Sequence, residues 1–556
     1  MKIDYNKLAD MLYPNVDKDI NYYFNKYPSR NIYKDAVVTR FAPSPTGYLH
    51  IGGLYQCVFH QMLSKTPSSV FYLRLEDTDQ KREIAEAGDI LYETMLEYGL
   101  EPSEGYRGKL EERGVYGPYV QSKRLDIYRT FAKYLVSRGR AFPCFCNKLE
   151  DKEEIAAKRE QEIQENNTTI DHDPCRSMSL EEIEENLSLG KPFALRLLSL
   201  GNPEKSFEFN DVVKGKRQIR ENGKDIILIK SNGIPVYAFA HAVDDTLMGT
   251  TVVVRGEDWF QSVASHVELF NAFGFEPIPY IHTPNIMKIE EGRKRKLSKR
   301  KDQEADCRFY LEDGYPIVAV KEYLLNIINS DFESWRKENP NLDYTEFPFS
   351  VSKVTTSNAL FDFAKLNDIS KEYIAKLSAE EVYKFVLDWA RKYDEEFAQM
   401  LINNKEFAIN VFNIDRGGEK PRKDIYKWSM VRDYYKYMFE DFSNIELDFR
   451  PITSLENELL YKCLHTYVVL FEDGIDKTFW FERMKKLANN FGYCSDNKEY
   501  KKNPLQYKGN LASFCNFIRY AFTGRTNTPD LFSICEVLGR DELFNRISII
   551  KHLLNL

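Results

Sequence analysis

The sequence predicts an α/β fold: a parallel sheet that is split by an α+β insertion and followed by an all-helical C-terminal region. Short apolar runs at 36–41, 70–75 and 250–255 each end in a turn or in polar residues, and helix-compatible segments follow the first and the last of them. This pattern is typical of a doubly wound sheet. From about residue 370 onward the apolar positions repeat at a helical period of about 3.6 residues, which predicts helices.

The remaining elements can be placed by the same periodicity. We expect a helical extension at 1–35 before the sheet begins. In the insertion we expect helices at 125–136 and 149–164, and strands at 193–198 and 225–230. The sheet should resume with strands at 237–242 and 250–255 and a helix at 261–273. Near the end, Thr528-Pro529-Asp530 predicts a helix start and Gly539 a helix stop.

Length and composition restrict the class of protein. A chain of 556 residues favours three to five domains at roughly 150 residues each, and 43% apolar residues supply several cores. No run of about 18 apolar residues occurs, so no transmembrane helix is expected. The N-terminal segment carries charged residues where a signal peptide would have its apolar centre. Nine scattered cysteines favour reduced thiols over a disulfide framework. We therefore expect a cytoplasmic protein with no membrane partner.

The first motif runs from Arg40 to Gly53 and reads Arg-Phe-Ala-Pro-Ser-Pro-Thr-Gly-Tyr-Leu-His-Ile-Gly-Gly. A strand, a proline-stiffened loop and a helix that starts near His50 predict an anion-binding corner at the end of a parallel sheet. Thr46, His50, Gly52 and Gly53 are the candidate nucleotide-binding residues, with glycines that let a flat base or ribose approach the backbone. A simple tight turn with a hydrogen-bonded histidine is the alternative.

The second motif is Lys296-Leu-Ser-Lys-Arg300, and it lies in a strongly basic segment. Seven cations fall within the nine residues from Arg293 to Lys301. A solvated basic face or a nucleic-acid patch is one interpretation, because local potential decides RNA binding even at a net charge of −8. The other is a loop over the β- and γ-phosphates of a triphosphate, where ammonium groups follow the charge onto pyrophosphate.

The two motifs together resemble the His-Ile-Gly-His and Lys-Met-Ser-Lys-Ser signatures of class I aminoacyl-tRNA synthetases. The form of the first motif is similar to that of bacterial-type glutamyl-tRNA synthetases, whereas glutaminyl enzymes tend to have Pro-Pro-Glu-Pro-Asn-Gly in that loop. Gly53 stands where the general signature has a second histidine, which is usual in the glutamate branch. The resemblance runs from about Ala36 to the C-terminus.

The resemblance implies the following organisation. It assigns 1–35 to an N-terminal helical extension, 36–117 to the first half of a Rossmann catalytic domain, 118–236 to an acceptor-binding connective insertion, 237–300 to the second half with the Lys-Leu-Ser-Lys-Arg loop, 301–375 to a stem-contact region and 376–556 to a helical anticodon-binding domain. We expect a monomer whose substrates are ATP, L-glutamate and a tRNA that accepts glutamate. Whether glutamine tRNA is also a substrate stays open.

A pocket for glutamate should combine arginines for its carboxylates with one anion for its ammonium group. Arg40, Glu76, Tyr237 and Arg255 fall at or near the ends of the expected strands, where a doubly wound fold binds ligands. The resemblance implies that Arg40 and Tyr237 hold the γ-carboxylate with help from Arg255. It further implies that Glu76 meets the α-ammonium group, and it adds two residues to the pocket, Ser44 and His241. Well-known members have Asn at the position of His241.

The resemblance also implies the chemistry. Glutamate attacks the α-phosphate of ATP, and the terminal ribose 2′-hydroxyl of tRNA then takes the acyl group from the adenylate. His50, Lys296 and Lys299 are the expected catalytic residues, with Leu297 and Ser298 in the same loop and Asp258 and Trp259 beside the nucleotide. Mg²⁺ should accompany ATP, because triphosphate charge needs screening.

A metal site is suggested in the insertion. Cys144, Cys146, His172 and Cys175 offer three thiols and an imidazole, close to a tetrahedral zinc set. Some glutamyl enzymes carry zinc there, although the later histidine of their pattern is Ser177 in this chain. Three reduced cysteines beside a surface histidine remain the alternative.

The C-terminal region has no strong RNA-binding signature of its own. Basic and aromatic residues interleave from Arg519 to Arg525, which suits stacking of unpaired bases, and Arg525 is the candidate tRNA contact. Three other functions are alternatives: a glutaminyl-specific synthetase, a non-catalytic RNA-binding or regulatory paralogue, and a truncated-type paralogue that glutamylates a modified base. The pocket arginines, the intact motifs and the long helical C-terminus respectively oppose them.

Overall fold

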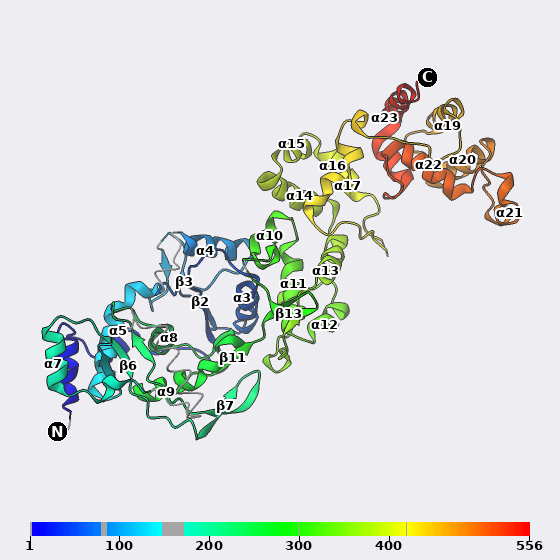
Figure 1. The fold of residues 1–556 in the computed structure, drawn as a ribbon. Helices are drawn as coiled ribbons and strands as arrows, with labels where there is room; N and C mark the ends of the chain where they lie inside the picture. The colour runs from blue at the N-terminus through cyan, green and yellow to red at the C-terminus, as the bar shows by residue number, and fades with distance from the viewer. Residues whose placement is uncertain (1–2, 79–85, 110, 147–171, 299, 419) are drawn as a thin grey trace. The chain divides into compact units, whose positions relative to one another are not determined.

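The computed structural model describes residues 3–78, 86–109, 111–146, 172–298, 300–418 and 420–556 (Figure 1). The chain divides into two compact units. The N-terminal unit consists of Met1–Phe309 and Lys321–Asp362, and the C-terminal unit of Tyr310–Val320 and Phe363–Leu556. Among the described residues, no helix has the length and apolar character needed to cross a membrane.

A parallel sheet forms the centre of the N-terminal unit, so the predicted fold class is confirmed. Its first strands are β1 (Val38–Phe41), β2 (Val70–Leu73), β3 (Glu104–Tyr106) and the antiparallel β4 (Glu112–Arg113). After the insertion come β10 (Val253–Gly256) and β11 (Tyr280–Thr283), which pair in parallel. The Val38 carbonyl accepts from the Thr251 N–H at 2.9 Å, which places β10 beside β1.

The helices of this sheet include α3 (Ile51–Leu63), α4 (Ala87–Glu97), α8 (Tyr237–Leu247) and α9 (Val263–Phe273). Helix α3 packs against β1 and β10. A side chain at Gly53 would meet Phe41 and Leu49, so glycine at this position lets α3 lie close to β1. Helices α8 and α9 pack on each other and share one apolar core with Val38.

The segment 237–242 was predicted as a strand, and this prediction is wrong: it forms the first part of α8. Helix α8 is buried on nearly every side, so its apolar residues form one continuous run instead of a stripe. Such a run is also what a fully buried strand shows. Three alanines at alternate positions and a proline two residues before the helix were the signals for a helix.

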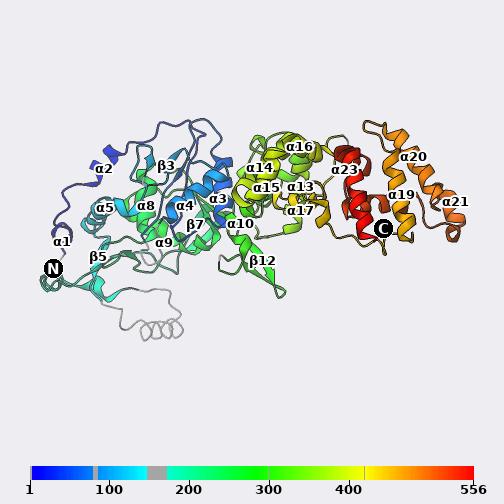
Figure 2. The ribbon, with the colours of Figure 1, turned by 90° about the horizontal axis from the view of Figure 1, so that it is seen from above.

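The N-terminal extension is helical, as predicted, and it packs on the rest of the unit. Helices α1 (Tyr5–Leu12) and α2 (Ile20–Lys26) contact α5 (Leu125–Ser137) (Figures 1 and 2). Beyond α2, Arg30 donates two hydrogen bonds to Glu104, of 2.9 and 2.8 Å, and one to the Met248 carbonyl at 2.7 Å. The extension is therefore tied to the sheet edge as well as to α5.

The insertion contains two small antiparallel sheets. One consists of β5 (Ala141–Cys144), β6 (Ala194–Leu197) and β9 (Ile227–Ile229), with α7 (Leu180–Ser188) between β5 and β6 in the chain. The other is the hairpin of β7 (Ser206–Asp211) and β8 (Gly215–Arg220). The predicted helix at 125–136 and both predicted strands are confirmed, while the helix predicted at 149–164 lies outside the described residues.

The basic segment is part of a small mixed sheet. Strand β12 (Ile286–Glu290) pairs with β13 (Arg293–Lys296) on one side and with β14 (Ala359–Leu360) on the other. The helices that follow β13 are α10 (Cys307–Glu312), α11 (Ile317–Ile328) and α12 (Phe332–Glu338).

The C-terminal unit is helical throughout its described residues, as predicted. Its helices from residue 363 onward are α13 (Phe363–Lys376), α14 (Ala379–Tyr393), α15 (Glu395–Asn403), α16 (Lys405–Asn413), α17 (Val431–Tyr434), α18 (Lys436–Phe439), α19 (Asn457–Leu470), α20 (Lys477–Asn490), α21 (Asn497–Lys502), α22 (Leu511–Thr523) and α23 (Leu531–Leu553). Two apolar cores lie in this unit, and α23 contributes to both.

The predicted start and stop of α23 need adjustment. Asp530 caps the helix by accepting from the Ser533 N–H at 3.0 Å, whereas the Thr528 hydroxyl donates to the Pro529 carbonyl. The carboxylate replaces the predicted hydroxyl cap. Gly539, with a φ of 74°, interrupts the helix, and a second helical segment continues directly after it.

Candidate functional site

The loop of the first motif is fixed between β1 and α3. His50 is the N-cap of α3, and its Nδ1 accepts from the Gly52 N–H at 2.9 Å. In the neutral imidazole this leaves the hydrogen on Nε2, the atom that can donate to a phosphate oxygen. The carbonyl of Pro43 accepts from the Glu76 N–H at 3.0 Å and joins the loop to the end of β2. Ser44 and Thr46 lie exposed in this loop.

The structure brings the first motif to the segment that follows the second. The Leu49 carbonyl accepts from the Cys307 N–H at 3.0 Å, and His50 pairs with Asp306 through their backbones. Cys307 lies seven residues after Arg300, which ends the second motif. Two stretches that are about 257 positions apart in the sequence therefore meet at the N-terminus of α3.

Acidic partners hold the basic segment in place. Lys296 forms an ion pair with Asp258, and Arg295 forms one with Asp302 at 2.6 Å. Asp302 also accepts from the Ser298 N–H at 2.9 Å and so closes the turn after β13, with Leu297 buried. Lys299 lies outside the described residues.

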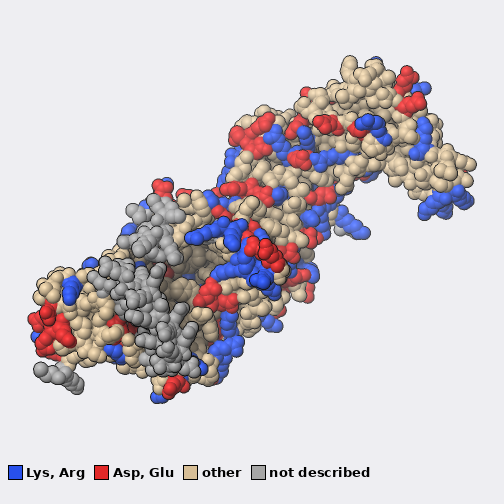
Figure 3. All heavy atoms as spheres, viewed as in Figure 1, with Lys and Arg blue, Asp and Glu red and all other residues tan. Residues whose placement is uncertain are grey.

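The basic segment belongs to a surface of mixed charge. On the face seen in Figure 3, Lys and Arg side chains are interspersed with Asp and Glu side chains over both units. The observed pairing of Lys296 and Arg295 with carboxylates agrees with this picture. Local ion pairs thus orient Lys296 and Arg295.

Asp258 and Trp259 connect the second motif to the predicted amino-acid pocket. They lie in the 3-10 helix Glu257–Ser262, directly after β10. Asp258 contacts Lys296, while the Trp259 carbonyl accepts from Arg255 Nη2 at 3.3 Å. The ring of Trp259 lies 4.3 Å from that of Tyr237, centre to centre. A chain of contacts therefore links Lys296 of the second motif to Arg255 and Tyr237.

Arg40 is held by a buried ion network. Its Nε lies 3.0 Å from Asp245 Oδ2, and Asp245 also contacts Arg74 at 2.6 Å. Burial by itself raises the pKa of Asp245, but the two guanidinium groups and His241 together lower it well below the usual range. Within the described residues, the buried Nη2 of Arg40 has no hydrogen-bond partner, which is the condition expected of a group that awaits a ligand.

Glu76 follows β2 and is buried next to the same network. It accepts a hydrogen bond from Arg74 at 3.1 Å. Burial raises the pKa of Glu76 to about 7, although the guanidinium groups of Arg74 and Arg40 act in the opposite direction. A cation placed beside this carboxyl group would restore its charge, which suits an ammonium ligand.

Tyr237 and His241 lie one helical turn apart on α8, with their rings stacked at 5.5 Å. His241 Nδ1 contacts Asp245, and Nε2 lies 2.8 Å from the Tyr280 hydroxyl. Burial lowers the pKa of His241 to about 4, so the ring is neutral at neutral pH. Both ring nitrogens are thus occupied by protein groups, and the stacked face is what His241 presents to Tyr237.

Comparisons with known proteins show the family of this chain. The sequence model of the family "tRNA synthetases class I (E and Q), catalytic domain" matches residues 36–368, and that of the family "Anticodon binding domain" matches residues 507–551. A glutamate–tRNA ligase of Clostridium perfringens is 43% identical over 550 residues, covering 98% of this chain and 100% of the relative. The chain belongs to the glutamate–tRNA ligase family.

Further members of the glutamate–tRNA ligase family show the same extent of similarity. The relative from Acetivibrio thermocellus is 43% identical over 98% of this chain, and that from Sorangium cellulosum is 38% identical over 95%. The matched regions cover 99% of the Acetivibrio protein and 96% of the Sorangium protein. A crystal structure of a glutamate tRNA ligase from Elizabethkingia meningosepticum has the same fold, with a TM-score of 0.74 at 24% identity over 93% of this chain and 99% of that one.

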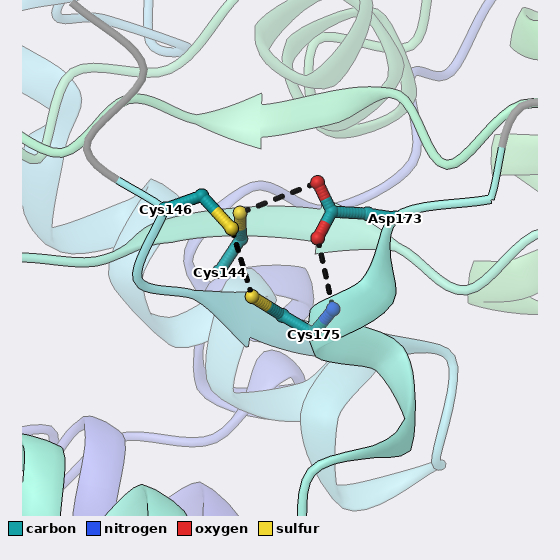
Figure 4. A group of neighbouring side chains, drawn as sticks. All are labelled: Cys144, Cys146, Asp173 and Cys175. Carbon is teal, nitrogen blue, oxygen red and sulfur yellow. Dashed lines mark hydrogen bonds between the residues drawn. The ribbon is translucent and has the colours of Figure 1, made fainter.

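The cysteine cluster of this glutamate–tRNA ligase family member has a different fourth group from the one predicted. Ligand atoms of Cys144, Cys146, Asp173 and Cys175 all lie within 4.8 Å of one another (Figure 4). His172 is exposed and lies outside this group, in which Asp173 is the fourth residue. Asp173 is the N-cap of the short helix that contains Cys175, which turns its carboxylate toward the thiols.

Arg525, the candidate tRNA contact in the C-terminal unit, has partners within the protein. Its Nη2 donates to the Asp433 carbonyl at 2.7 Å and lies 3.0 Å from the Asp433 carboxylate. The guanidinium group is about one third exposed. The same group can thus hold two segments of the unit together and reach a ligand from the surface.

Sequence reasoning missed several buried titratable groups near the predicted pocket residues: Arg74, Asp211, Asp245, His266 and His282. A signal existed for one of them. Asp245 sits four residues after His241 in an apolar segment, which places both side chains on one side of a helix. The prediction of a strand at 237–242 hid that relationship, because a strand would have separated them.

Proposed function

We propose that this chain attaches L-glutamate to tRNA in an ATP-dependent reaction that proceeds through glutamyl adenylate. The full-length similarity to glutamate–tRNA ligases supports this function. The structural observation that supports this function most strongly is a chain of contacts. Lys296 pairs with Asp258, and the next residue, Trp259, accepts a hydrogen bond from Arg255. This chain connects the proposed phosphate-binding motif to the proposed glutamate-binding arginine.

In the first step, an α-carboxylate oxygen of glutamate attacks the α-phosphorus of ATP, and pyrophosphate leaves. No protein nucleophile is needed, so the side chains position the substrates and stabilise charge. We assign His50 Nε2, Lys296, Leu297, Ser298 and Lys299 to the phosphates. Gly52, Gly53, Thr46, Asp258 and Trp259 line the nucleotide side. Mg²⁺ bound to ATP would screen the charge of the triphosphate.

Binding of the amino acid uses the buried network. The open Nη2 of Arg40, together with Tyr237 and Arg255, takes the γ-carboxylate of glutamate. Glu76, whose pKa is raised to about 7, takes the α-ammonium group, which draws it into the charged form. Ser44 adds a hydroxyl, and His241 supports Tyr237 by stacking.

In the second step, the 2′-hydroxyl of the terminal tRNA ribose attacks the carbonyl carbon of the adenylate, and AMP leaves. The hydroxyl proton passes to the departing phosphate or to solvent. We propose that 118–236 contacts the acceptor end, 301–375 the stem and 376–556 the anticodon, with Arg525 among the contacts. The match of residues 507–551 to an anticodon-binding family supports the last of these assignments.

We also propose that the insertion binds one zinc ion. Three thiols and one carboxylate within 4.8 Å fit the donors that tetrahedral zinc prefers. Burial raises the pKa of Cys144 and of Cys175, so in the metal-free protein these thiols keep their protons. A cation would release those protons and relieve the contact between Cys146 and Cys175, whose sulfurs are 3.3 Å apart.

A monomer in the reducing cytoplasm is our proposal for the working state of the protein. The proposal of a reducing compartment is supported by the nine cysteines, all of which are free thiols. Size-exclusion chromatography with light scattering should give the mass of one chain without tRNA, and the mass of one chain plus one tRNA with it. A mass of two chains would contradict the monomer.

Charging assays test the proposed function. Purified glutamate and glutamine tRNAs are each incubated with ATP and labelled glutamate or glutamine. We expect glutamate on glutamate tRNA and no transfer of glutamine. Transfer of glutamine would favour the glutaminyl-specific alternative, and tRNA binding with no transfer at all would favour a non-catalytic RNA-binding paralogue. The same assay decides whether glutamine tRNA accepts glutamate.

A further inference from the structure

Arg255 is held by two imidazole rings. Its Nε donates to His282 Nε2 at 2.9 Å, and its Nη1 lies 2.8 Å from His266 Nδ1. The guanidinium group also lies over the ring of Tyr280 at 4.3 Å, and Nη2 donates to the Trp259 carbonyl. Counted over the described residues, these bonds leave two of the five N–H groups of a guanidinium for a ligand.

The partners of Arg255 differ in kind from those of Arg40. Arg40 is paired directly with the Asp245 carboxylate. Arg255 is only 4% exposed, yet no ion pair joins it to a carboxylate in the described part of the chain. Imidazole acceptors fix the orientation of a guanidinium group but do not neutralise its charge. A buried charge without a partner is costly, so a ligand that supplies the missing carboxylate gains binding energy.

Asp211 determines which nitrogen of His282 faces Arg255. It ends β7 of the insertion, and its Oδ2 lies 2.6 Å from His282 Nδ1. Its Oδ1 accepts from the N–H groups of Val213 and Lys214, at 3.0 and 2.7 Å, which locks the carboxylate in the hairpin turn. With the carboxylate accepting from Nδ1–H, the lone pair of the neutral ring is on Nε2, where Arg255 donates.

The charge environment favours neutral rings at both positions. Burial lowers the pKa of His282, and the Arg255 guanidinium lowers it further, although Asp211 acts in the opposite direction. Burial and Arg255 hold the pKa of His266 well below its ordinary value. A protonated imidazole at either position would place its own N–H group against an N–H group of Arg255.

We propose that Asp211 and His282, with His266, position Arg255 as a guanidinium group whose charge is balanced only when a substrate carboxylate binds. This inference rests on the proposed function, because it takes glutamate as that substrate. The hairpin β7–β8 belongs to the insertion, so the insertion contributes directly to amino-acid selection. Glutamine, which carries an amide in place of the carboxylate, would leave Arg255 unbalanced and would bind more weakly.

Steady-state kinetics of ATP–pyrophosphate exchange in the presence of tRNA test the role of His282. His282→Leu should raise the KM for glutamate by about 10- to 100-fold, the range for one hydrogen bond to a charged group. The KM for ATP should stay within about twofold. His60→Leu is the matched control, because His60 is equally buried but contacts Thr39 and Phe71, and it should leave both KM values unchanged. Equal increases in both KM values for His282→Leu would overturn the proposal.

Two further variants separate positioning from general packing. His282→Gln keeps an acceptor oxygen near the place of Nε2, so it should recover most of the loss of His282→Leu. In an Arg255→Lys background, where the Nε–H donor is absent, His282→Leu should have little additional effect on the KM for glutamate. Additive losses in the double variant would show that His282 does not act through Arg255.

One measurement does not depend on catalysis. The chain has eight histidines, and ¹⁵N spectra of histidine-labelled protein, assigned with His282→Gln, report the state of each ring. We expect His282 neutral with its hydrogen on Nδ1 at pH 7, and Asp211→Asn should change that state. A charged ring or a hydrogen on Nε2 would overturn the proposal even if the wild-type protein charges tRNA. Failure of the wild type to charge tRNA, with the expected spectrum, would instead count against the proposed function.

Discussion

Arg40 and Asp245 form an ion pair in the interior of the N-terminal unit, with side chains only 3% and 0% exposed. Asp245 also contacts Arg74, His241 and the Tyr72 hydroxyl. One carboxylate thus compensates two buried guanidinium groups beside the predicted glutamate pocket. The pair lies between helix α8 and strand β1, so it joins the two halves of the split sheet.

Asp245→Ala should destabilise the N-terminal unit by about 3–5 kcal/mol, because buried Arg40 loses its ion-pair partner and Arg74 loses one of its carboxylates. Urea unfolding of the two variants, with the N-terminal unit followed by hydrogen–deuterium exchange, measures this loss. The matched control is Glu208→Ala, which removes an exposed pair with Lys216 and should leave the midpoint unchanged. A similar, small change for both variants would show that the buried network contributes little.

Lys296→Ala should slow ATP–pyrophosphate exchange by about 100-fold and leave the melting temperature unchanged, because Lys296 is exposed and its expected role is electrostatic. We expect the same of Lys299→Ala. Lys294→Ala, two residues earlier on strand β13, is the control and should retain activity. Parallel losses of melting temperature and exchange would instead mean that the Lys296–Asp258 pair serves stability.

Metal analysis of protein purified without a histidine tag should find about one zinc ion per chain. Cys146→Ser, Cys175→Ser and Asp173→Asn should each lower the zinc content, since each removes a ligand of the cluster. His172→Ala should keep the metal, because His172 lies outside the cluster. Wild-type protein free of zinc after purification in zinc-containing buffer would contradict the site.

Stability of the N-terminal unit should fall as the pH is lowered from about 6.5 toward 4. The buried histidines of this unit are His60, His241, His266 and His282, and burial lowers the pKa of each. The unfolded chain binds protons below about pH 6.5 that the folded unit does not, so acid favours unfolding. Glu76, with a pKa raised to about 7, opposes this trend, because it loses stability as the pH rises from about 4.5 to 7.

The histidine contribution can be isolated with His60→Leu. Burial lowers the pKa of His60 to about 3, so it contributes the full slope between pH 6 and 4. The variant should reduce the slope of unfolding free energy against pH by about 1.4 kcal/mol per pH unit in that range. An unchanged slope would mean that His60 is already protonated in the folded state.

Arg525→Ala should weaken tRNA binding and reduce its dependence on salt, without changing the KM for ATP. Asp433→Ala provides the opposite test. It removes the carboxylate that competes for Arg525 but keeps the backbone carbonyl that also holds it. Tighter tRNA binding by Asp433→Ala is therefore expected. If both variants bind tRNA as the wild type does, Arg525 is a structural link within the C-terminal unit.

The fold class was predictable because its signals are local. Strands β1 and β2 and helix α3 each show an apolar pattern with a turn at the expected end, and the helical C-terminal region follows one period. The strand predicted at 237–242 failed for the opposite reason, since a helix buried on all sides shows no amphipathic period. The cap of α23 was predicted less accurately as well. Thr528 and Asp530 both have side chains suited to an N-cap, and Asp530 is the residue that caps the helix.

The candidate site was only partly predictable. Arg40, Tyr237, His241 and Arg255 do come together, and their roles toward glutamate remain predictions. The groups that orient them were missed, because Asp211 and His282 are 71 residues apart and no local pattern connects them. The fourth residue of the cysteine cluster also differs from the predicted one, for a similar reason. His172 and Asp173 are neighbours, and only the geometry of the N-cap shows which one turns toward the sulfurs.

Arg30 donates to the carbonyl of Met248, which lies 218 residues later in the chain. During synthesis the first helices leave the ribosome long before that acceptor exists. At about 5–20 residues per second, the interval is on the order of 10–40 s. Helices α1 and α2 can pack earlier, on α5, whereas the bond that ties the segment after α2 to the sheet has to wait for Met248.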